Sequence, residues 1–229
     1  MVVPIIPAFN PDEKLIKIVK ELKKYFKKII IVNDGSESDE VFKKLEGYKE
    51  CVILTHKENY GKGRALKTAF SYYQDNLLKD YNGVIALDCD AQHKVSDVIK
   101  ISNVLDKNNN FILGTRLFNT KETPLRNKMG NRITSRVFKI LYHIYLKDTQ
   151  TGLRARPNRL IPFLLTIPGD RFEYEINELI ELVKKNEKIE EVDIETVYLT
   201  DSNKKSNFKV IKDSYKIYKL LFSNRKKNK

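Results

Sequence analysis

Long apolar runs and cysteines are both scarce in this chain of 229 residues. No apolar stretch approaches the roughly 20 residues that a membrane-spanning helix needs, so we do not expect the protein to cross a bilayer. Cys51 and Cys89 are the only cysteines, too few for a disulfide framework, which favours a reduced cytoplasmic setting. Residues 1–7 lack the basic region and the small-residue cleavage site of a signal peptide, and we expect a first strand there.

Other signatures are missing as well. The chain shows no internal repeat, no low-complexity linker and no clear boundary between domains, and its 41 % of apolar residues suffices for an ordinary core. The net charge is +13. The basic residues either form a solvated surface or attract phosphorylated substrates and anionic lipid head groups. Because they are scattered and match no nucleic-acid-binding signature, a nucleic-acid partner is not expected.

Apolar runs alternate with helical patterns in the first half of the chain. Strands are predicted at 2–7, 29–32, 51–54, 84–87 and 111–113, and helices at 15–26, 40–45 and 64–78. Residues 10–13 (Asn-Pro-Asp-Glu) predict the start of the first helix, with Asn10 as its cap. The alternation is typical of βαβ units, so we expect an α/β fold with a mainly parallel sheet flanked by helices.

Beyond about residue 115 the pattern changes, and the second half is predicted to extend the same sheet within a single domain. We expect a loop at 117–125, an amphipathic helix at 133–145, a polar turn at 148–156, a helix at 172–185, a strand at 189–199, a loop at 201–207 and a last helix at 211–222. The polar clusters 8–10, 33–35 and 88–90 each follow a predicted strand. They should meet at the sheet edge where such folds bind ligands.

The most informative motif follows the fourth predicted strand. The apolar run 84–87 ends in Asp88-Cys89-Asp90-Ala91-Gln92-His93. Two carboxylates at a sheet edge can converge on a divalent cation, and hard oxygen ligands suit Mg²⁺ or Mn²⁺. Gln92 offers a carbonyl ligand, whereas His93 is a ligand, a diphosphate contact or a packing residue. The alternative interpretation is a pair of aspartates that caps a helix.

Two further clusters are candidate donor contacts. Asp34, in the segment 33–36 after the second strand, either accepts hydrogen bonds from a nucleobase or ribose or closes an Asx-turn with Gly35 at positive φ. Residues 59–65 form a Gly-rich turn that opens a helix, with Lys62 and Arg64 as its basic residues. Such a turn binds an anion at the helix N-terminus or is an ordinary turn, and its spacing fits neither a P-loop nor G-x-G-x-x-G.

Five motifs in this order resemble the family 2 glycosyltransferases, which have a Rossmann-like GT-A fold. The branch they resemble most contains the dolichyl- and polyprenyl-phosphate mannosyl- and glucosyltransferases. The motifs are Pro7-Ala8-Phe9-Asn10, Val32-Asn33-Asp34-Gly35-Ser36, Asn59-Tyr60-Gly61-Lys62-Gly63, Asp88-Cys89-Asp90-Ala91-Gln92-His93 and Asp148-Thr149-Gln150-Thr151-Gly152-Leu153-Arg154.

The resemblance implies a nucleotide-sugar donor, a divalent cation and inversion at the anomeric carbon. Residues 1–115 would form the donor half and 116–229 the acceptor half. Carried over by motif, Pro7, Phe9, Asn10 and Asp34 contact the nucleoside, and Asp88, Asp90 and Gln92 hold the metal and diphosphate. Arg116 resembles the family's basic residue near the transferred sugar and the acceptor phosphate. Lys62, Arg64 and Cys89 are further candidate donor contacts. Arg126 and Arg132 are further candidates for the acceptor phosphate; the alternative is that these arginines are surface or salt-bridged.

The implied acceptor decides whether a base is needed. A lipid phosphate is already ionised near pH 7, and positioning by arginines is then sufficient. A hydroxyl of a glycan needs a general base, for which Glu173 and Glu175 are the candidates unless they only supply acids to the first turn of a helix. A lipid acceptor also predicts docking of 133–146, 211–222 and the basic tail on an anionic membrane, directly or through a membrane-protein partner, unless these stripes are core.

Two other functions remain to be distinguished. A sugar-phosphate nucleotidyltransferase usually has a Gly-rich loop with a basic residue after its first strand, whereas residues 7–10 here are Pro-Ala-Phe-Asn. A binding module for anionic surfaces would leave the two aspartates at the sheet edge unexplained. The sequence therefore favours the transferase.

Overall fold

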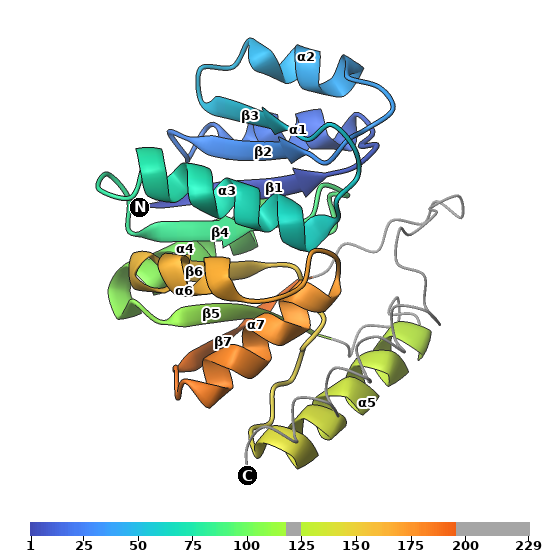
Figure 1. The fold of residues 1–229 in the computed structure, drawn as a ribbon, viewed down its shortest axis with the longest axis vertical. Coiled ribbons are helices and arrows are strands. Elements are labelled where there is room, and N and C mark those ends of the chain that lie inside the picture. Colours follow the sequence, from blue (N-terminus) through green and yellow to red (C-terminus); the bar gives the residue numbers. More distant parts are fainter. Residues whose placement is uncertain (118–124, 196–229) are drawn as a thin grey trace.

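The structure is a computed structural model that describes residues 1–117 and 125–195, with residues 125–130 described in backbone only. Its centre is a seven-stranded sheet with the order β3-β2-β1-β4-β6-β5-β7 (Figure 1). The strands are β1 (Val2–Ala8), β2 (Ile29–Asn33), β3 (Cys51–Thr55), β4 (Gly83–Ala86), β5 (Phe111–Arg116), β6 (Arg154–Pro157) and β7 (Ile189–Ile194).

The sheet is mainly parallel, as the alternating pattern predicts. β1 pairs in parallel with β2 and β4, β2 with β3, and β5 with β7. Only β6 runs antiparallel to its neighbours β4 and β5 in the described part of the chain. The prediction of a polar turn over 148–156 is therefore wrong for its last residues, because an Arg-Ala-Arg-Pro segment carries no apolar alternation that would indicate a strand.

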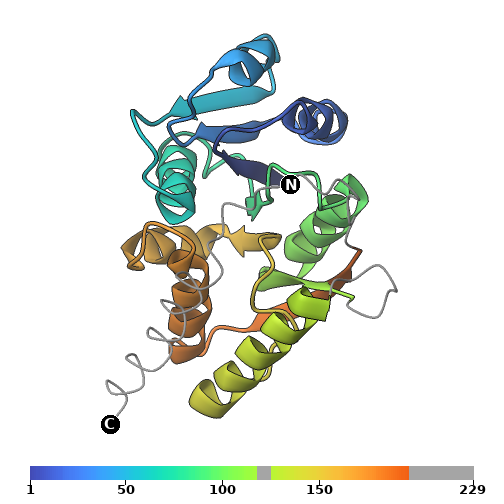
Figure 2. The ribbon, with the colours of Figure 1, turned by 90° about the vertical axis from the view of Figure 1, so that its right-hand side faces the viewer.

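Helices cover both faces of the sheet (Figures 1 and 2). They are α1 (Lys14–Leu22), α2 (Glu40–Glu46), α3 (Lys62–Asn76), α4 (Val95–Asn108), α5 (Leu125–Tyr142), α6 (Ile161–Thr166) and α7 (Glu173–Lys184), with a 3-10 turn at Asn158–Leu160. Because side chains alternate along a strand, Val3 and Ile5 of β1 face the core beneath α3, α6 and α7, whereas Val2 and Ile6 face the core beneath α1, α2 and α4.

The first helix begins later than its sequence predicts. The Asn10 side chain does not cap it, since α1 starts at Lys14 and its cap position, Glu13, makes no side-chain capping bond. Asn10 has a φ of 47° and instead accepts a hydrogen bond from the Glu37 backbone N–H at 2.9 Å. The competing contact with the loop after β2 therefore takes the side chain that would have capped the helix.

Other differences lie in the second half. α4 and α6 occur where no element was predicted, although Val98, Ile101 and Leu105 of α4 have helical spacing. α5 begins at Leu125, within the expected loop and before the predicted helix start at residue 133. β7 ends at Ile194. The remaining predicted elements at 201–207 and 211–222 lie outside the described residues, and no helix in the described residues is long and apolar enough to cross a membrane.

Candidate active site

The candidate site lies at the carboxyl ends of the parallel strands β1, β2 and β4. The Asp34 backbone N–H donates to the Ala8 carbonyl at 2.8 Å, which joins the loops that follow β1 and β2. The Leu87 backbone N–H donates to the Ile5 carbonyl at 3.0 Å, so the Asp88–Asp90 motif leaves the same edge of the sheet. The three polar clusters predicted to share one edge do share it.

The Asp88 carboxylate contacts Lys62 and His93, and the backbone at Gly152 packs closely against it. Its Oδ1 lies 2.7 Å from Lys62 Nζ, and its Oδ2 lies 3.3 Å from His93 Nε2. A Cβ added to Gly152 would lie 2.4 Å from Oδ2, so only glycine lets the backbone approach the carboxylate this closely. Burial raises the pKa of Asp88, but Lys62 and His93 lower it by more, and the group is ionised at neutral pH.

Lys62 connects the Asp88 motif with α7. Its ammonium lies 2.7 Å from Asp88 and 2.9 Å from Glu175 Oε2, and its side chain is only 14 % exposed. Burial alone would lower the pKa of Lys62, but the two carboxylates raise it above its ordinary value. Lys62 is therefore positively charged at neutral pH, at the carboxyl ends of the strands.

The rest of the motif is a compact turn. The Gln92 backbone N–H donates to Asp90 Oδ1 at 3.0 Å, and Ala91 has a left-handed φ of 62°. The Gln92 side chain is half-buried. Burial, with smaller contributions from the two aspartates, raises the pKa of the Cys89 thiol to about 12, so Cys89 is a neutral group beside the carboxylates. Both cysteines of the chain are free thiols.

The donor set of this motif fits a hard divalent cation that is shared with a ligand. No cluster of three or more His, Cys, Asp or Glu side chains suited to a metal ion occurs among the described residues. Mg²⁺ is commonly held by one or two carboxylates together with substrate phosphates, and Asp88 and Asp90 supply such carboxylates. The residues therefore suit a cation whose remaining ligands come with the substrate.

Asp34 is buried, at 3 % exposure, and its carboxylate accepts four hydrogen bonds from the protein. His56 Nδ1 and the Tyr60 backbone N–H contact Oδ1 at 2.7 and 3.0 Å. Asn59 Nδ2 and the Gly61 backbone N–H contact Oδ2 at 2.9 and 2.8 Å. Because a carboxylate has about four acceptor positions, Asp34 holds the Gly-rich turn in this structure, and contact with a nucleobase stays a prediction.

The turn after β2 also forms, with a different acceptor. Gly35 has the expected positive φ, 70°, but the Ser36 backbone N–H donates to the Asn33 side chain at 2.9 Å. Asn10 is exposed, Phe9 is half-buried, and Pro7 is buried within β1. Of these three predicted nucleoside contacts, Phe9 and Asn10 retain exposed surface at the sheet edge.

The glycines of the Gly-rich turn allow the start of α3 to pack against the start of α7. An added Cβ would lie 2.6 Å from the Asp170 carbonyl at Gly61 and 2.5 Å from Tyr174 Cβ at Gly63. Arg64 Nη2 lies 3.0 Å from Asp170 Oδ2, and this ion pair is solvent-exposed. The predicted donor contact Arg64 is thus paired with protein, whereas Lys62 faces the Asp88 motif.

Arg116 forms a bidentate ion pair with Asp148. Its Nε and Nη2 lie 2.6 and 3.0 Å from the two carboxylate oxygens of Asp148, which is fully buried. The pair fixes the guanidinium at the end of β5. Arg132 is exposed on α5, and the Arg126 side chain lies outside the described residues.

Sequence reasoning missed a buried ionic cluster next to the site. Arg154 and Arg156 of β6 are fully buried, and both pair with the buried Glu178 of α7 at distances of 2.5 to 2.9 Å. Burial raises the pKa of Glu178, but the two guanidinium groups lower it by more. The available signal was weak, because Glu178 lies in a predicted helix that also buries Glu175 and Asn177.

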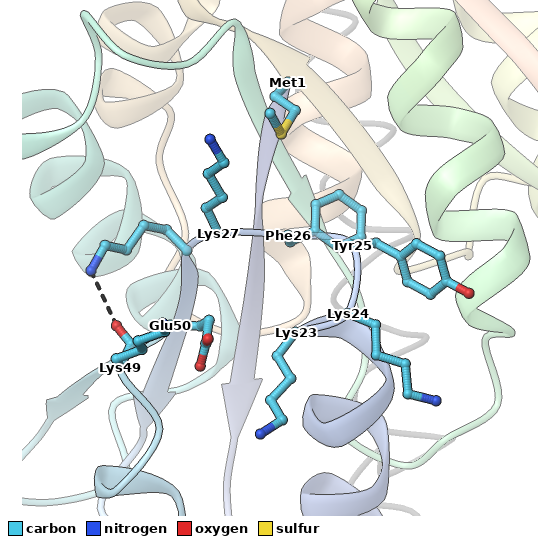
Figure 3. A pocket seen from close by; sticks show the side chains of 9 residues that line it. Met1, Lys23, Lys24, Tyr25, Phe26, Lys27, Lys49 and Glu50 are labelled. Atoms are coloured by element: carbon cyan, nitrogen blue, oxygen red, sulfur yellow. Dashed lines mark hydrogen bonds between the residues drawn. The ribbon is translucent and has the colours of Figure 1, made fainter.

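The hollow drawn in Figure 3 lies away from this site. It is lined by Met1, Tyr25, Phe26 and Glu50 together with Lys23, Lys24, Lys27, Lys28 and Lys49. Met1, Lys28 and Glu50 immediately precede β1, β2 and β3, so the hollow is at the amino ends of the strands. The Asp88 motif follows β4 and therefore lies at the opposite, carboxyl ends of the strands.

The fold is that of the GT-A glycosyltransferases. The chain superposes on a glucosyl-3-phosphoglycerate synthase from Mycobacterium tuberculosis in complex with Mn²⁺, UDP-glucose and phosphoglyceric acid with a TM-score of 0.72 at 13 % identity, over 98 % of this chain and 79 % of that one. Residues 5–163 match the model for glycosyl transferase family 2. The protein belongs to this family and is a glycosyltransferase.

Curated relatives agree with this assignment. A UDP-N-acetylglucosamine--dolichyl-phosphate N-acetylglucosaminyltransferase from Methanococcus voltae is 30 % identical in an alignment that covers 85 % of this chain and 84 % of the relative. A dolichyl-phosphate beta-glucosyltransferase, ALG5D, from Trichomonas vaginalis is 27 % identical over 66 % of this chain and 51 % of its own length.

Proposed function

We propose that the protein is an inverting, metal-dependent glycosyltransferase that moves a sugar from a nucleotide-sugar to a polyprenyl-phosphate-type acceptor. The observation that carries the proposal is the pair Asp88 and Asp90 at the carboxyl ends of the strands, with the Lys62 ammonium 2.7 Å from Asp88. Carboxylates suit a cation and an ammonium suits a phosphate, so together they suit a nucleoside diphosphate. The relatives named as dolichyl-phosphate transferases support the acceptor class.

On the donor side, residues 1–115 would bind the nucleotide-sugar. Phe9 and Asn10 would contact the nucleoside, next to the turn that Asp34 holds in place. Asp88, Asp90 and Gln92 would hold Mg²⁺ or Mn²⁺. When bound, such a cation neutralises charge that develops on the departing diphosphate. The protein's own contribution is the close backbone at Gly152, which limits where the Asp88 carboxylate can lie.

On the acceptor side, each candidate base contacts a protein group through one of its two carboxylate oxygens. Glu173 Oε1 accepts hydrogen bonds from the backbone N–H groups of Asp170 and Arg171, each at 3.3 Å. Glu175 is ion-paired with Lys62 at 2.9 Å. Each glutamate thus holds a protein group with one carboxylate oxygen, which fits a structural role. A lipid phosphate, which is already ionised near pH 7, would need no general base.

Arg116 is the basic residue we assign to the acceptor and the transferred sugar. Asp148 holds two of its guanidinium nitrogens, so the side chain is oriented before substrate arrives. The exposed Arg132 and the Arg126 position on α5 would extend this positive surface toward the acceptor. Residues 116–229 would thus form the acceptor half.

A lipid acceptor would bring the protein to the inner face of the cell membrane as a peripheral cytoplasmic enzyme. Ile133, Ile140, Ile144 and Tyr145 on and just after α5 are exposed, although this helix also buries Phe138 in the core. No acidic residue occurs between 123 and 147. An exposed apolar stripe with basic neighbours is typical of a helix that lies on an anionic bilayer.

The function is tested by identifying the products. The protein is incubated with UDP-, GDP- or dTDP-sugars, Mn²⁺ and a polyprenyl phosphate, and we expect a nucleoside diphosphate and a lipid-linked sugar in equal amounts. Asp90→Asn should lower turnover by about 100-fold, because one carboxylate ligand is lost. Transfer only to a glycan hydroxyl would replace the acceptor in the proposal, and release of pyrophosphate would indicate a nucleotidyltransferase.

A further inference from the structure

Lys62 occupies the position at Asp88 that a cation would need. The ammonium lies 2.7 Å from Asp88 Oδ1, and His93 Nε2 lies 3.3 Å from Oδ2, so both oxygens of this carboxylate face nitrogen atoms. The side chains of Lys62 and His93 are 14 % and 4 % exposed. The Asp88 side chain is still 35 % exposed, but a divalent cation that binds it must approach the positive charge of Lys62 closely.

We propose that Lys62 is a built-in counter-ion that excludes a bare cation from Asp88 until a nucleotide arrives. The diphosphate of the nucleotide then becomes the new partner of the lysine, and Asp88 is released for the cation. This inference rests on the proposed function and adds an order of binding to it. Its consequence is that cation and nucleotide bind cooperatively, each raising the affinity for the other by the same factor.

The surroundings of Lys62 suit such an exchange. Glu175 Oε2 contacts the ammonium at 2.9 Å, and the other oxygen of Glu175 is buried without a hydrogen-bond partner. Glu175 therefore stays with the lysine when Asp88 leaves. The nearby Glu178 is not an alternative partner, because Arg154 and Arg156 already hold it. A lysine has three donors on a flexible stem, so a shift from carboxylate to phosphate needs no backbone movement.

The test measures Mn²⁺ binding directly, by the electron paramagnetic resonance signal of free Mn²⁺, with UDP, with GDP and without nucleotide. For the wild-type protein we expect weak binding of Mn²⁺ alone and binding at least about tenfold tighter with the preferred nucleotide. In Lys62→Gln, the electrostatic repulsion between the lysine ammonium and Mn²⁺ is removed. Mn²⁺ alone should then bind about tenfold more tightly than to the wild-type protein, and the enhancement by nucleotide should shrink.

Lys67→Gln is the matched control. Lys67 lies in the same helix α3, its side chain is 16 % exposed, and its ammonium pairs with Asp170 at 3.0 Å. The substitution removes the same charge at similar burial without touching Asp88. We expect the binding of Mn²⁺, with and without nucleotide, to match that of the wild-type protein.

Two results separate the inference from the proposed function. If Lys62→Gln does not bind bare Mn²⁺ more tightly than the wild-type protein, the counter-ion role is wrong, whereas the transferase stands if nucleotide and Mn²⁺ still bind. If Mn²⁺ associates with neither protein in the presence of UDP or GDP, and dTDP gives the same result, the metal-dependent function itself is wrong. If Lys62→Gln does not fold, the wild-type protein alone still tests the inference. Equal affinity for Mn²⁺ with and without nucleotide would overturn it.

Discussion

At the scale of single residues, glycine and aspartate shape the site more than the side chains expected to contact substrate. The missing side chain at Gly152 leaves room for the Asp88 carboxylate, and Asp34 accepts the hydrogen bonds that hold the Gly-rich turn. The sequence indicated both aspartates through their positions after strands. It did not indicate that Asp34 is saturated by protein donors, because that depends on Asn59 and Gly61 reaching it from another loop.

Gly152→Ala should weaken cation-assisted nucleotide binding by about 10- to 100-fold, because the new methyl group would displace the Asp88 carboxylate. Calorimetric titration of the nucleotide in the presence of Mn²⁺ measures this change. Gly47→Ala is the control, since a Cβ there meets no atom within 4 Å. Equal affinities in both variants would show that the position of Asp88 is not critical for the donor.

Asp34→Asn should lower the free energy of unfolding by about 1–3 kcal/mol. The amide would turn an NH₂ group toward donors that now contact a carboxylate oxygen, so at least one buried hydrogen bond is lost. Urea denaturation measures the effect. Asp75→Asn, at an exposed position of α3, should change stability by no more than about 0.5 kcal/mol. A loss of similar size in both variants would contradict the role of Asp34 in holding the turn.

At the scale of elements, the strands β1 to β5 and the helices α3 and α7 follow from periodicity in the sequence, whereas β6 does not. A buried strand is normally recognised by apolar residues, and β6 contains Arg154 and Arg156. These arginines are tolerated in the core because Glu178 reaches them from α7. A pairing between distant charged residues cannot be deduced from local spacing, and this is why the sequence suggested a turn.

Glu178→Gln should destabilise the fold by about 3–5 kcal/mol, since it leaves two buried guanidinium groups without their carboxylate. The expected result is a clear fall of the denaturation midpoint in urea or on heating. Glu181→Gln in the same helix removes a half-buried partner of Lys184 and should cost less than about 1 kcal/mol. Comparable midpoints for the two variants would mean that the β6 arginines are neutralised by other groups.

At the scale of the whole molecule, the carboxyl ends and the amino ends of the strands carry different groups. The carboxyl edge carries Asp88 and its partners, whereas the lysine-lined hollow of Figure 3 is at the amino edge. A membrane that presents a lipid acceptor should therefore meet the side of the molecule that carries α5. The sequence predicted an amphipathic helix there, but it could not tell that Ile140 is 70 % exposed while Phe138 is buried.

Ile140→Glu should reduce binding to vesicles of phosphatidylcholine and phosphatidylglycerol by about tenfold or more, because it removes an apolar contact and adds a repelled charge. Co-sedimentation at low and high salt measures the binding, which salt should weaken. Tyr25→Glu changes a similarly exposed residue near the opposite edge and should bind like the wild-type protein. Failure of the wild-type protein to bind would remove α5 as the docking helix.

The antiparallel β6 also dictates when the sheet can be completed during synthesis. β4 and β5 leave the ribosome before β6, yet they are joined in the sheet only through it. Arg154 and Arg156 in turn need Glu178, which is translated later still. A nascent chain in which β6 has not yet paired therefore carries an open β4 edge, and a chaperone that shields exposed strands would act within this interval.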